Sequence, residues 1–125
     1  MPTLALGEEI TIDQLLAVAR GQQVRLNFGQ KTQARVKKAR AAVDAIVASG
    51  KAVYGVNTGF GALAKERIDQ KDTGTLQRNL LLSHAVGFGD DMAVNEKSLA
   101  LLLRIQSMCQ GVSGVRPQVV RWLMA

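Results

Sequence analysis

The stretch from Tyr54 to Gly61, which reads Tyr-Gly-Val-Asn-Thr-Gly-Phe-Gly, gathers several groups that could do chemistry in a short piece of chain. Its three glycines disfavour a regular helix or strand, because glycine loses more backbone entropy on folding than any other residue. They also allow positive φ angles and close approach of the backbone to a neighbour. Asn57 and Thr58 add an amide and a hydroxyl to the phenol of Tyr54. We therefore expect a polar loop held between helices, a common location for a functional site.

Tyr54 could transfer protons from this loop if its surroundings favour the phenolate. A free phenol ionises near pH ~10, so a tyrosine base at neutral pH needs positive charge or hydrogen-bond donors beside its oxygen. Backbone N–H groups of a glycine-rich loop, or a helix N-terminus, could supply them. The structural alternative is a core tyrosine whose hydroxyl bonds a carbonyl, and the spacing alone leaves both readings open.

The chain has a single histidine, His84, which stands on the same helical row as Leu76 and Leu80. A lone histidine among leucines is most often a satisfied core residue. No second histidine, cysteine or carboxylate stands at ligand spacing from it, so the sequence predicts no metal site.

The remaining sequence predicts a mainly α-helical fold with short β-strands near the N-terminus. Thr11 and Gln14 have the spacing of a capping box, and Pro117 suits the first turn of a last helix. One predicted helix, 98–109, is apolar almost all round, the pattern of a helix buried on every side, and in a chain this short it suggests a helix intended for the middle of a larger bundle. The predicted strands cover residues 3–6 and 24–26, and the other helices cover 12–19, 31–48 and 76 to the glycines at 87–89.

The composition indicates a globular chain. Its 125 residues suffice for one domain, and 47% of them are hydrophobic. The net charge of +6 raises the question of an anionic partner, but only the run from Lys31 to Arg40 is dense in cations. Aromatic residues make up 4%, which leaves few rings to stack on bases. We therefore expect a solvated basic face and no nucleic-acid partner.

Cysteine content and hydropathy indicate the compartment. The one cysteine, Cys109, excludes an internal disulfide, suits a reducing compartment and is expected to be packed and inert. The N-terminus lacks the features of a signal peptide, and no apolar run approaches the ~20 residues of a membrane span. The sequence therefore predicts a cytoplasmic protein with no membrane partner.

Three blocks of the sequence, in order, resemble the aromatic amino acid ammonia-lyases, and most nearly their histidine-specific branch. They are the Tyr54–Gly61 loop, the segment Leu76–Gly87 that contains Ser83-His84, and the segment Gly111–Pro117. Together they cover most of the chain from about Arg25 onward. The resemblance implies a helical-bundle enzyme of which residues 1–125 form a single N-terminal domain, ending before the segment that makes the electrophile.

The resemblance also implies an activity and site roles. The reaction would be elimination of ammonia from L-histidine to give urocanate, in histidine catabolism, by a cytoplasmic homotetramer. By position, Tyr54 would handle the proton at the β-carbon and His84 would help to orient the substrate ring. Asn57, Thr58 and Gly59 would bind the carboxylate or amine of the substrate, or would hydrogen-bond the loop to itself.

The electrophile of the family is 4-methylidene-imidazol-5-one (MIO), which forms by cyclisation of an internal Ala-Ser-Gly. The only such triplet in this sequence, Ala48-Ser49-Gly50, closes a predicted helix just before Tyr54, where Gly50 has an ordinary capping role. The family triplet normally lies further along the chain. We therefore expect MIO to form outside these 125 residues, and the isolated chain to be inactive as a lyase.

Two alternatives stay open on the sequence. The chain could belong to a tyrosine or phenylalanine ammonia-lyase or to an aminomutase. It could instead be a non-enzymatic helical module that uses the basic face of 31–40 as an interaction surface.

Overall fold

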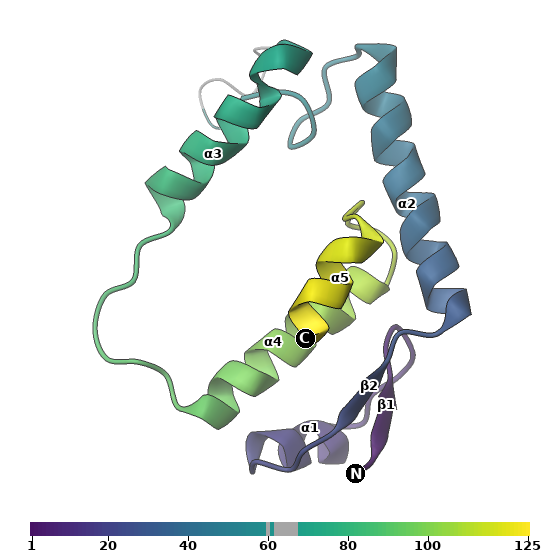
Figure 1. Ribbon diagram of the computed structural model, residues 1–125, viewed down its shortest axis with the longest axis vertical. Coiled ribbons are helices and arrows are strands. Elements are labelled where there is room, and N and C mark those ends of the chain that lie inside the picture. The colour runs from purple at the N-terminus through teal and green to yellow at the C-terminus, as the bar shows by residue number, and fades with distance from the viewer. Residues whose placement is uncertain (60, 62–67) are drawn as a thin grey trace. The chain divides into compact units, whose positions relative to one another are not determined.

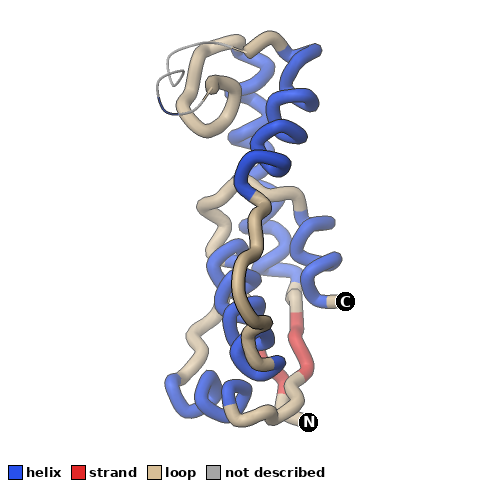
Figure 2. Tube along the Cα trace, turned by 90° about the vertical axis from the view of Figure 1, so that its left-hand side faces the viewer, coloured by secondary structure: helices blue, strands red, loops and turns tan. Residues whose placement is uncertain are grey.

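The computed structural model describes residues 1–59, 61 and 68–125, and this part of the chain is mainly helical with two short strands near the N-terminus (Figures 1 and 2). The predicted fold class is thereby confirmed. Contacts divide the chain into a terminal unit, Met1–Ala42 with Asp91–Ala125, and a central unit, Val43–Asp90. In chain order the elements are β1 (Thr3–Ala5), α1 (Ile12–Ala19), β2 (Arg25–Asn27), α2 (Gln30–Ser49), the 3-10 helix η2 (Gln70–Asp72), α3 (Thr73–His84), α4 (Val94–Cys109) and α5 (Pro117–Met124).

The two strands pair in parallel, with Leu4 opposite Leu26 (Figure 1). Parallel neighbours need a crossover connection rather than a tight hairpin, and α1 provides it here. The pairing continues past β1, because the Leu6 amide donates to the Asn27 carbonyl over 2.9 Å. Both predicted strands are confirmed to within a residue or two, whereas their parallel pairing was not predicted from the sequence.

Several helix ends form where the local sequence places them. At the start of α1, the Gln14 amide donates to Thr11 Oγ1 over 3.3 Å and the Thr11 amide donates to Gln14 Oε1 over 2.9 Å. This is the predicted capping box, which pairs two amides that lack partners in the first turn. Gly50 follows α2 with φ of 67°, the left-handed conformation of a helix-ending glycine, and Pro117 occupies the first turn of α5.

The core of the terminal unit forms around α4, which α1 and α5 both contact. Figure 1 shows α5 lying along α4. Apolar side chains that are removed from water come from β1, from the residues directly after β1 and β2, and from four helices. They are Leu4, Leu6, Val18, Phe28, Val36, Leu102, Ile105, Met108, Cys109 and Val120.

Within the described part of the chain, α4 is covered on one side only, and its place in the middle of a larger bundle stays a prediction. Leu102 and Ile105 are buried, but Leu101 and Leu103 on other faces are 42% and 46% exposed. The reason is that β1, β2, α1 and α5 supply enough packing surface for one side of the helix only. Arg104, the lone cation among these leucines, is exposed, so it remains solvated.

Arg35 links three segments of the terminal unit. From α2, its Nη2 donates to the Gly7 carbonyl over 2.7 Å and its Nε donates to the Cys109 carbonyl over 3.2 Å. Both glycines beside it have positive φ, 79° at Gly7 and 73° at Gly111. A β-carbon at Gly7 would lie 2.8 Å from the Cys109 oxygen, and one at Gly111 would lie 3.1 Å from the Arg35 backbone. Only glycine therefore fits on either side of the guanidinium.

The basic run on α2 is partly used inside the protein. Besides Arg35, Lys31 Nζ lies 3.7 Å from Glu8 Oε1. The expected solvated face is thus made by fewer cations than the sequence suggested, with Lys37 and Lys38 exposed.

The Arg35 bridge generates a stability prediction. Arg35→Met keeps much of the aliphatic volume but leaves the carbonyls of Gly7 and Cys109 without their donor, so it should lower the free energy of unfolding by about 1–3 kcal/mol. Urea unfolding followed by circular dichroism measures this change. The control is Lys37→Met on the same helix, which should change stability by less than about 0.5 kcal/mol. Equal effects of the two substitutions would contradict the bridge.

Cys109 generates a prediction about pH. Burial raises the pKa of the Cys109 thiol, an effect that the Arg35 charge partly offsets. The folded thiol keeps its proton at alkaline pH values where the unfolded thiol has lost it, so the contribution of Cys109 to stability falls as pH rises through that window. The difference in unfolding free energy between wild type and Cys109→Ala should therefore shrink from pH ~8 to pH ~10. A difference that stays constant would contradict the raised pKa.

Candidate active site

Tyr54 lies at a tight turn shortly after α2, in the central unit. The Val56 amide donates to the Val53 carbonyl over 3.0 Å, which closes a four-residue turn with Tyr54 and Gly55 at its centre. Gly55 has φ of 76°, the positive angle that a type II turn requires at its third position. The Tyr54 side chain is 64% exposed, so the alternative of a core tyrosine does not hold within these residues. The glycine-rich motif therefore presents the ring to solvent.

The buried side chain of Asn57 hydrogen-bonds to two backbone groups of the same loop. Its Oδ1 accepts from the Val53 amide over 2.8 Å, and its Nδ2 donates to the Lys51 carbonyl over 2.9 Å. The residue is 7% exposed. Both ends of the side-chain amide are thus bonded to the backbone of the loop.

Thr58 and Gly59 continue the loop and are buried. Thr58 Oγ1 donates to the Gly59 carbonyl over 3.0 Å, and the Asn57 carbonyl accepts from the Ile68 amide over 3.2 Å. Their polar groups bond the loop to itself, which was one of the two readings of this segment. Phe60 of the motif lies outside the described residues.

His84 is the last residue of α3 and is exposed, so it is not the core histidine of the alternative reading. Its Nδ1 lies 3.0 Å from the Leu80 carbonyl and 2.9 Å from Ser83 Oγ. Ser83 Oγ itself donates to the Leu80 carbonyl over 3.0 Å. These side-chain bonds occupy the carbonyl near the end of the helix, and α3 ends three residues before the glycine at 87 that was expected to stop it.

Two tautomers of a neutral His84 ring fit these contacts. In one, Nδ1–H donates to the Leu80 carbonyl and Nε2 is the acceptor; in the other, Ser83 Oγ donates to Nδ1 and Nε2 bears the hydrogen. In the first tautomer, His84 can accept a hydrogen bond at Nε2 from an N–H or O–H group of a ligand.

The third block of the sequence lies in the terminal unit and joins α4 to α5. Gly111 and Gly114 both have positive φ, and Arg116 precedes the helix in an extended conformation. This block therefore forms the connection between two helices of the terminal unit. Tyr54 and His84, by contrast, belong to the central unit.

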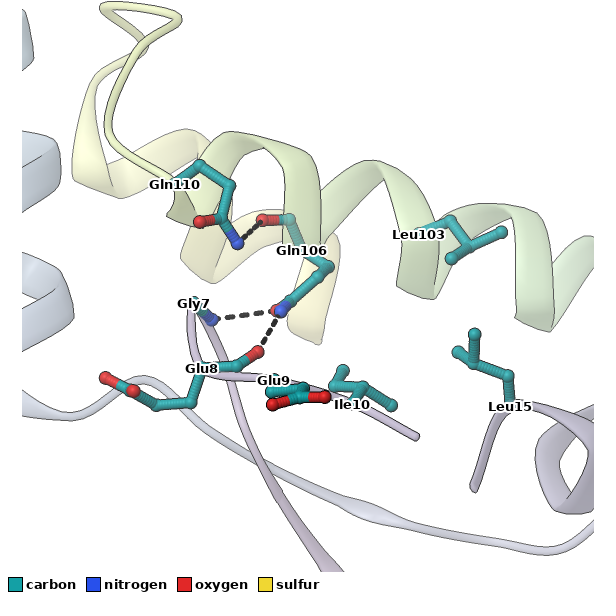
Figure 3. Close-up of a pocket in the computed structure, with 8 residues that line it drawn as sticks. All are labelled: Gly7, Glu8, Glu9, Ile10, Leu15, Leu103, Gln106 and Gln110. Atoms are coloured by element: carbon teal, nitrogen blue, oxygen red, sulfur yellow. Dashed lines mark hydrogen bonds between the residues drawn. The ribbon is translucent and has the colours of Figure 1, made fainter. Parts of the chain in front are cut away.

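A cavity of about 340 Å³ lies in the terminal unit (Figure 3). Gln106 dominates its polar side: Oε1 accepts from the Gly7 amide over 2.8 Å, and Nε2 donates to the Glu8 carbonyl. These bonds tie α4 to the segment after β1, which indicates a structural role. The lining residues are Gly7, Glu8, Glu9, Ile10, Leu15, Leu103, Gln106 and Gln110.

Ala48-Ser49-Gly50 does not fit a precursor of MIO. Ser49 Oγ donates to the Ile46 carbonyl over 2.8 Å, and the Gly50 amide donates to the Val47 carbonyl over 3.3 Å. The triplet is an ordinary helix C-terminus, whose polar groups bond back to the last turn of α2. Across residues 1–59, 61 and 68–125, no three His, Cys, Asp or Glu side chains gather as metal ligands, and no helix is long and apolar enough to span a bilayer.

Both the sequence and the fold of the chain are similar to those of known proteins. The profile of the family described as "Aromatic amino acid lyase" matches residues 10–125. The whole chain is 44% identical to a histidine ammonia-lyase of Anaeromyxobacter dehalogenans (strain 2CP-C), of which it covers 25%. Two similar solved structures are histidine ammonia-lyase from Trypanosoma cruzi, with 31% identity and a TM-score of 0.84, and tyrosine aminomutase from Streptomyces globisporus, with 28% identity and the same TM-score. Each alignment covers 99% of this chain and 23% of the solved chain, so the chain spans about a quarter of the length of the proteins it matches.

Proposed function

Because this chain belongs to the aromatic amino acid lyase family, we propose that it forms the N-terminal part of an ammonia-lyase that converts L-histidine to urocanate and ammonia. The identity of 44% over the whole chain to a histidine ammonia-lyase supports the substrate. The exposed phenol of Tyr54 on its glycine turn supports the reaction. We further propose the homotetrameric, cytoplasmic enzyme that the sequence resemblance implies.

Tyr54 is the base in this proposal. Elimination breaks the bond from the β-carbon to hydrogen and the bond from the α-carbon to nitrogen, and forms a double bond between the two carbons. The phenolate oxygen of Tyr54 takes the β-proton, the electron pair of the C–H bond becomes the double bond, and the amine leaves as ammonia. A base must reach its proton, and the exposed position of Tyr54 satisfies that requirement. MIO makes the amine a better leaving group in this family, and it would come from outside these residues.

His84 is the substrate-orienting residue. In the tautomer that donates from Nδ1 to the Leu80 carbonyl, its Nε2 lone pair accepts the N–H of a substrate imidazole. An acceptor at this point favours substrates whose ring carries a donor. L-histidine and L-tyrosine both do, whereas L-phenylalanine has none. Thr58 and Gly59 are buried within the loop, where the Thr58 hydroxyl donates to the Gly59 carbonyl.

A tyrosine aminomutase is the second candidate. The similarity to the Streptomyces globisporus enzyme favours it, and the same base and the same ring acceptor would serve it. Product analysis separates the two, because a lyase releases ammonia and an unsaturated acid, whereas an aminomutase returns a β-amino acid.

The base role of Tyr54 can be tested in the full-length protein. In our proposal, this chain forms the N-terminal part of that protein. Tyr54→Phe removes only the hydroxyl, so kcat for L-histidine should fall by about 10²- to 10⁴-fold, as expected for loss of a general base. Urocanate absorbance reports the rate. Ser107→Ala, which removes an exposed hydroxyl from α4, should leave kcat unchanged, and the 125-residue chain alone should show no turnover. Retained activity in Tyr54→Phe would reject Tyr54 as the base.

The acceptor role of His84 predicts a change of specificity. His84→Leu removes the acceptor for the substrate ring, so kcat/KM for L-histidine should fall by about tenfold to a hundredfold, the effect of one lost hydrogen bond, relative to kcat/KM for L-phenylalanine. Ser83→Ala is the matched control, because it removes one partner of Nδ1 and keeps the Leu80 carbonyl in place. An unchanged ratio of the two substrates in His84→Leu would contradict the role.

A further inference from the structure

We propose that Asn57 is a positioning residue for Tyr54, and that its side-chain amide holds the loop instead of binding substrate. The inference rests on the proposed base role of Tyr54. It concerns the ring of hydrogen bonds that Asn57 makes around the turn, which we call the 51–57 clamp.

The clamp joins Asn57, three residues after Tyr54, to the chain that precedes Tyr54. Asn57 Oδ1 accepts from the amide of Val53, the residue just before Tyr54, over 2.8 Å. Asn57 Nδ2 donates to the carbonyl of Lys51, three residues before Tyr54, over 2.9 Å. Within this ring, the Val53 carbonyl accepts from the amides of Val56 and Asn57 over 3.0 and 3.3 Å. Both backbone polar groups of Val53 are therefore bonded within the loop.

Burial distinguishes the two side chains. Asn57 is 7% exposed and Tyr54 is 64% exposed, so the phenol projects from a loop whose interior contains the amide. A substrate that reaches the phenol would meet the outside of the loop, whereas the amide is turned to the backbone. The same geometry reinterprets the sequence prediction that placed Asn57 among the substrate-binding residues.

The clamp contributes directly to the conformation of the turn. Among the described residues, no atom lies within 4 Å of the position where a β-carbon of Gly55 would stand. Glycine also has more conformational freedom than any other residue type. Without the amide, the Val53 N–H and the Lys51 carbonyl lose these partners, so the backbone that carries the phenol is less constrained. Catalysis is sensitive to this, because a displacement of about 1 Å can cost on the order of a hundredfold in rate.

A double-mutant cycle in the full-length protein tests the role. Asn57→Ala should lower kcat by about tenfold to a hundredfold with KM nearly unchanged. In a Tyr54→Phe background the same substitution should lower kcat by less than about twofold, because the group that it positions is already absent. An increase in KM at constant kcat would identify Asn57 as a substrate ligand, and an equal loss of kcat in both backgrounds would identify a general effect on folding. Either result overturns the proposal.

Two further variants keep the test decisive. Asn57→Asp retains the acceptor for the Val53 amide and loses the donor to Lys51, so it should fold and give an intermediate loss of kcat; a loss as large as that of Asn57→Ala would overturn the clamp. Ser49→Ala removes hydroxyl bonds just outside the clamp, to the Ile46 carbonyl and the Lys51 amide, and should leave kcat within about twofold.

Hydrogen exchange on the 125-residue chain tests the clamp without any turnover. The Val53 amide should be protected in the wild type and should exchange at least about tenfold faster in Asn57→Ala, while the helical circular dichroism stays the same. Unchanged protection would overturn the clamp directly. Absence of turnover in the wild-type full-length protein would instead overturn the proposed function, and the positioning role with it, so the two failures are distinguishable.

Discussion

The terminal unit depends on one guanidinium that pairs backbone carbonyls from two distant parts of the chain. Arg35 donates to Gly7, at the end of the first strand segment, and to Cys109, at the last turn of α4. Unpaired carbonyls at these two points would be costly, because the neighbouring Leu6 and Cys109 side chains are fully buried. The two flanking glycines are the complement of this bridge, since any β-carbon there would collide with Arg35 or its partners. A polar interaction thus joins the apolar core to the connections that leave it.

The central unit uses the same principle on a smaller scale. An amide from Asn57 pairs backbone groups of Lys51 and Val53, and a ring of seven residues is closed around an exposed phenol. Here the bonded groups are neighbours in sequence, so the loop carries its geometry largely within itself. The two units therefore differ in what holds them. Contacts between distant residues hold the terminal unit, whereas contacts within a few residues hold the loop of the proposed base. Such a loop can present a side chain to a site that other segments complete.

The exposed leucines of α4 are consistent with the place of this chain in its family. The chain matches about a quarter of the length of histidine ammonia-lyases and aminomutases, and helices of the described part cover only one side of α4. Apolar surface of this kind normally marks a contact with further protein. The family relation and the exposed leucines of α4 therefore agree with each other.

Interactions between near neighbours in the sequence determine most of the features that could be predicted. The capping box at Thr11, the glycine after α2 and the proline at the start of α5 act over one to four residues, so the sequence alone located these helix ends. The motif residues Tyr54 and His84 were likewise identified from their neighbours, and the structure adds that both are exposed.

Contacts between residues far apart in the chain could not be predicted from the sequence. The sequence placed Arg35 among the cations of a solvated face, but its partners lie 28 and 74 residues away. It showed an apolar helix at 98–109 without indicating which side would be covered, and two strands without their parallel pairing. Helix ends follow from bonds between near neighbours, whereas burial and long-range hydrogen bonds depend on which segments meet, and that is decided only when the whole chain has packed.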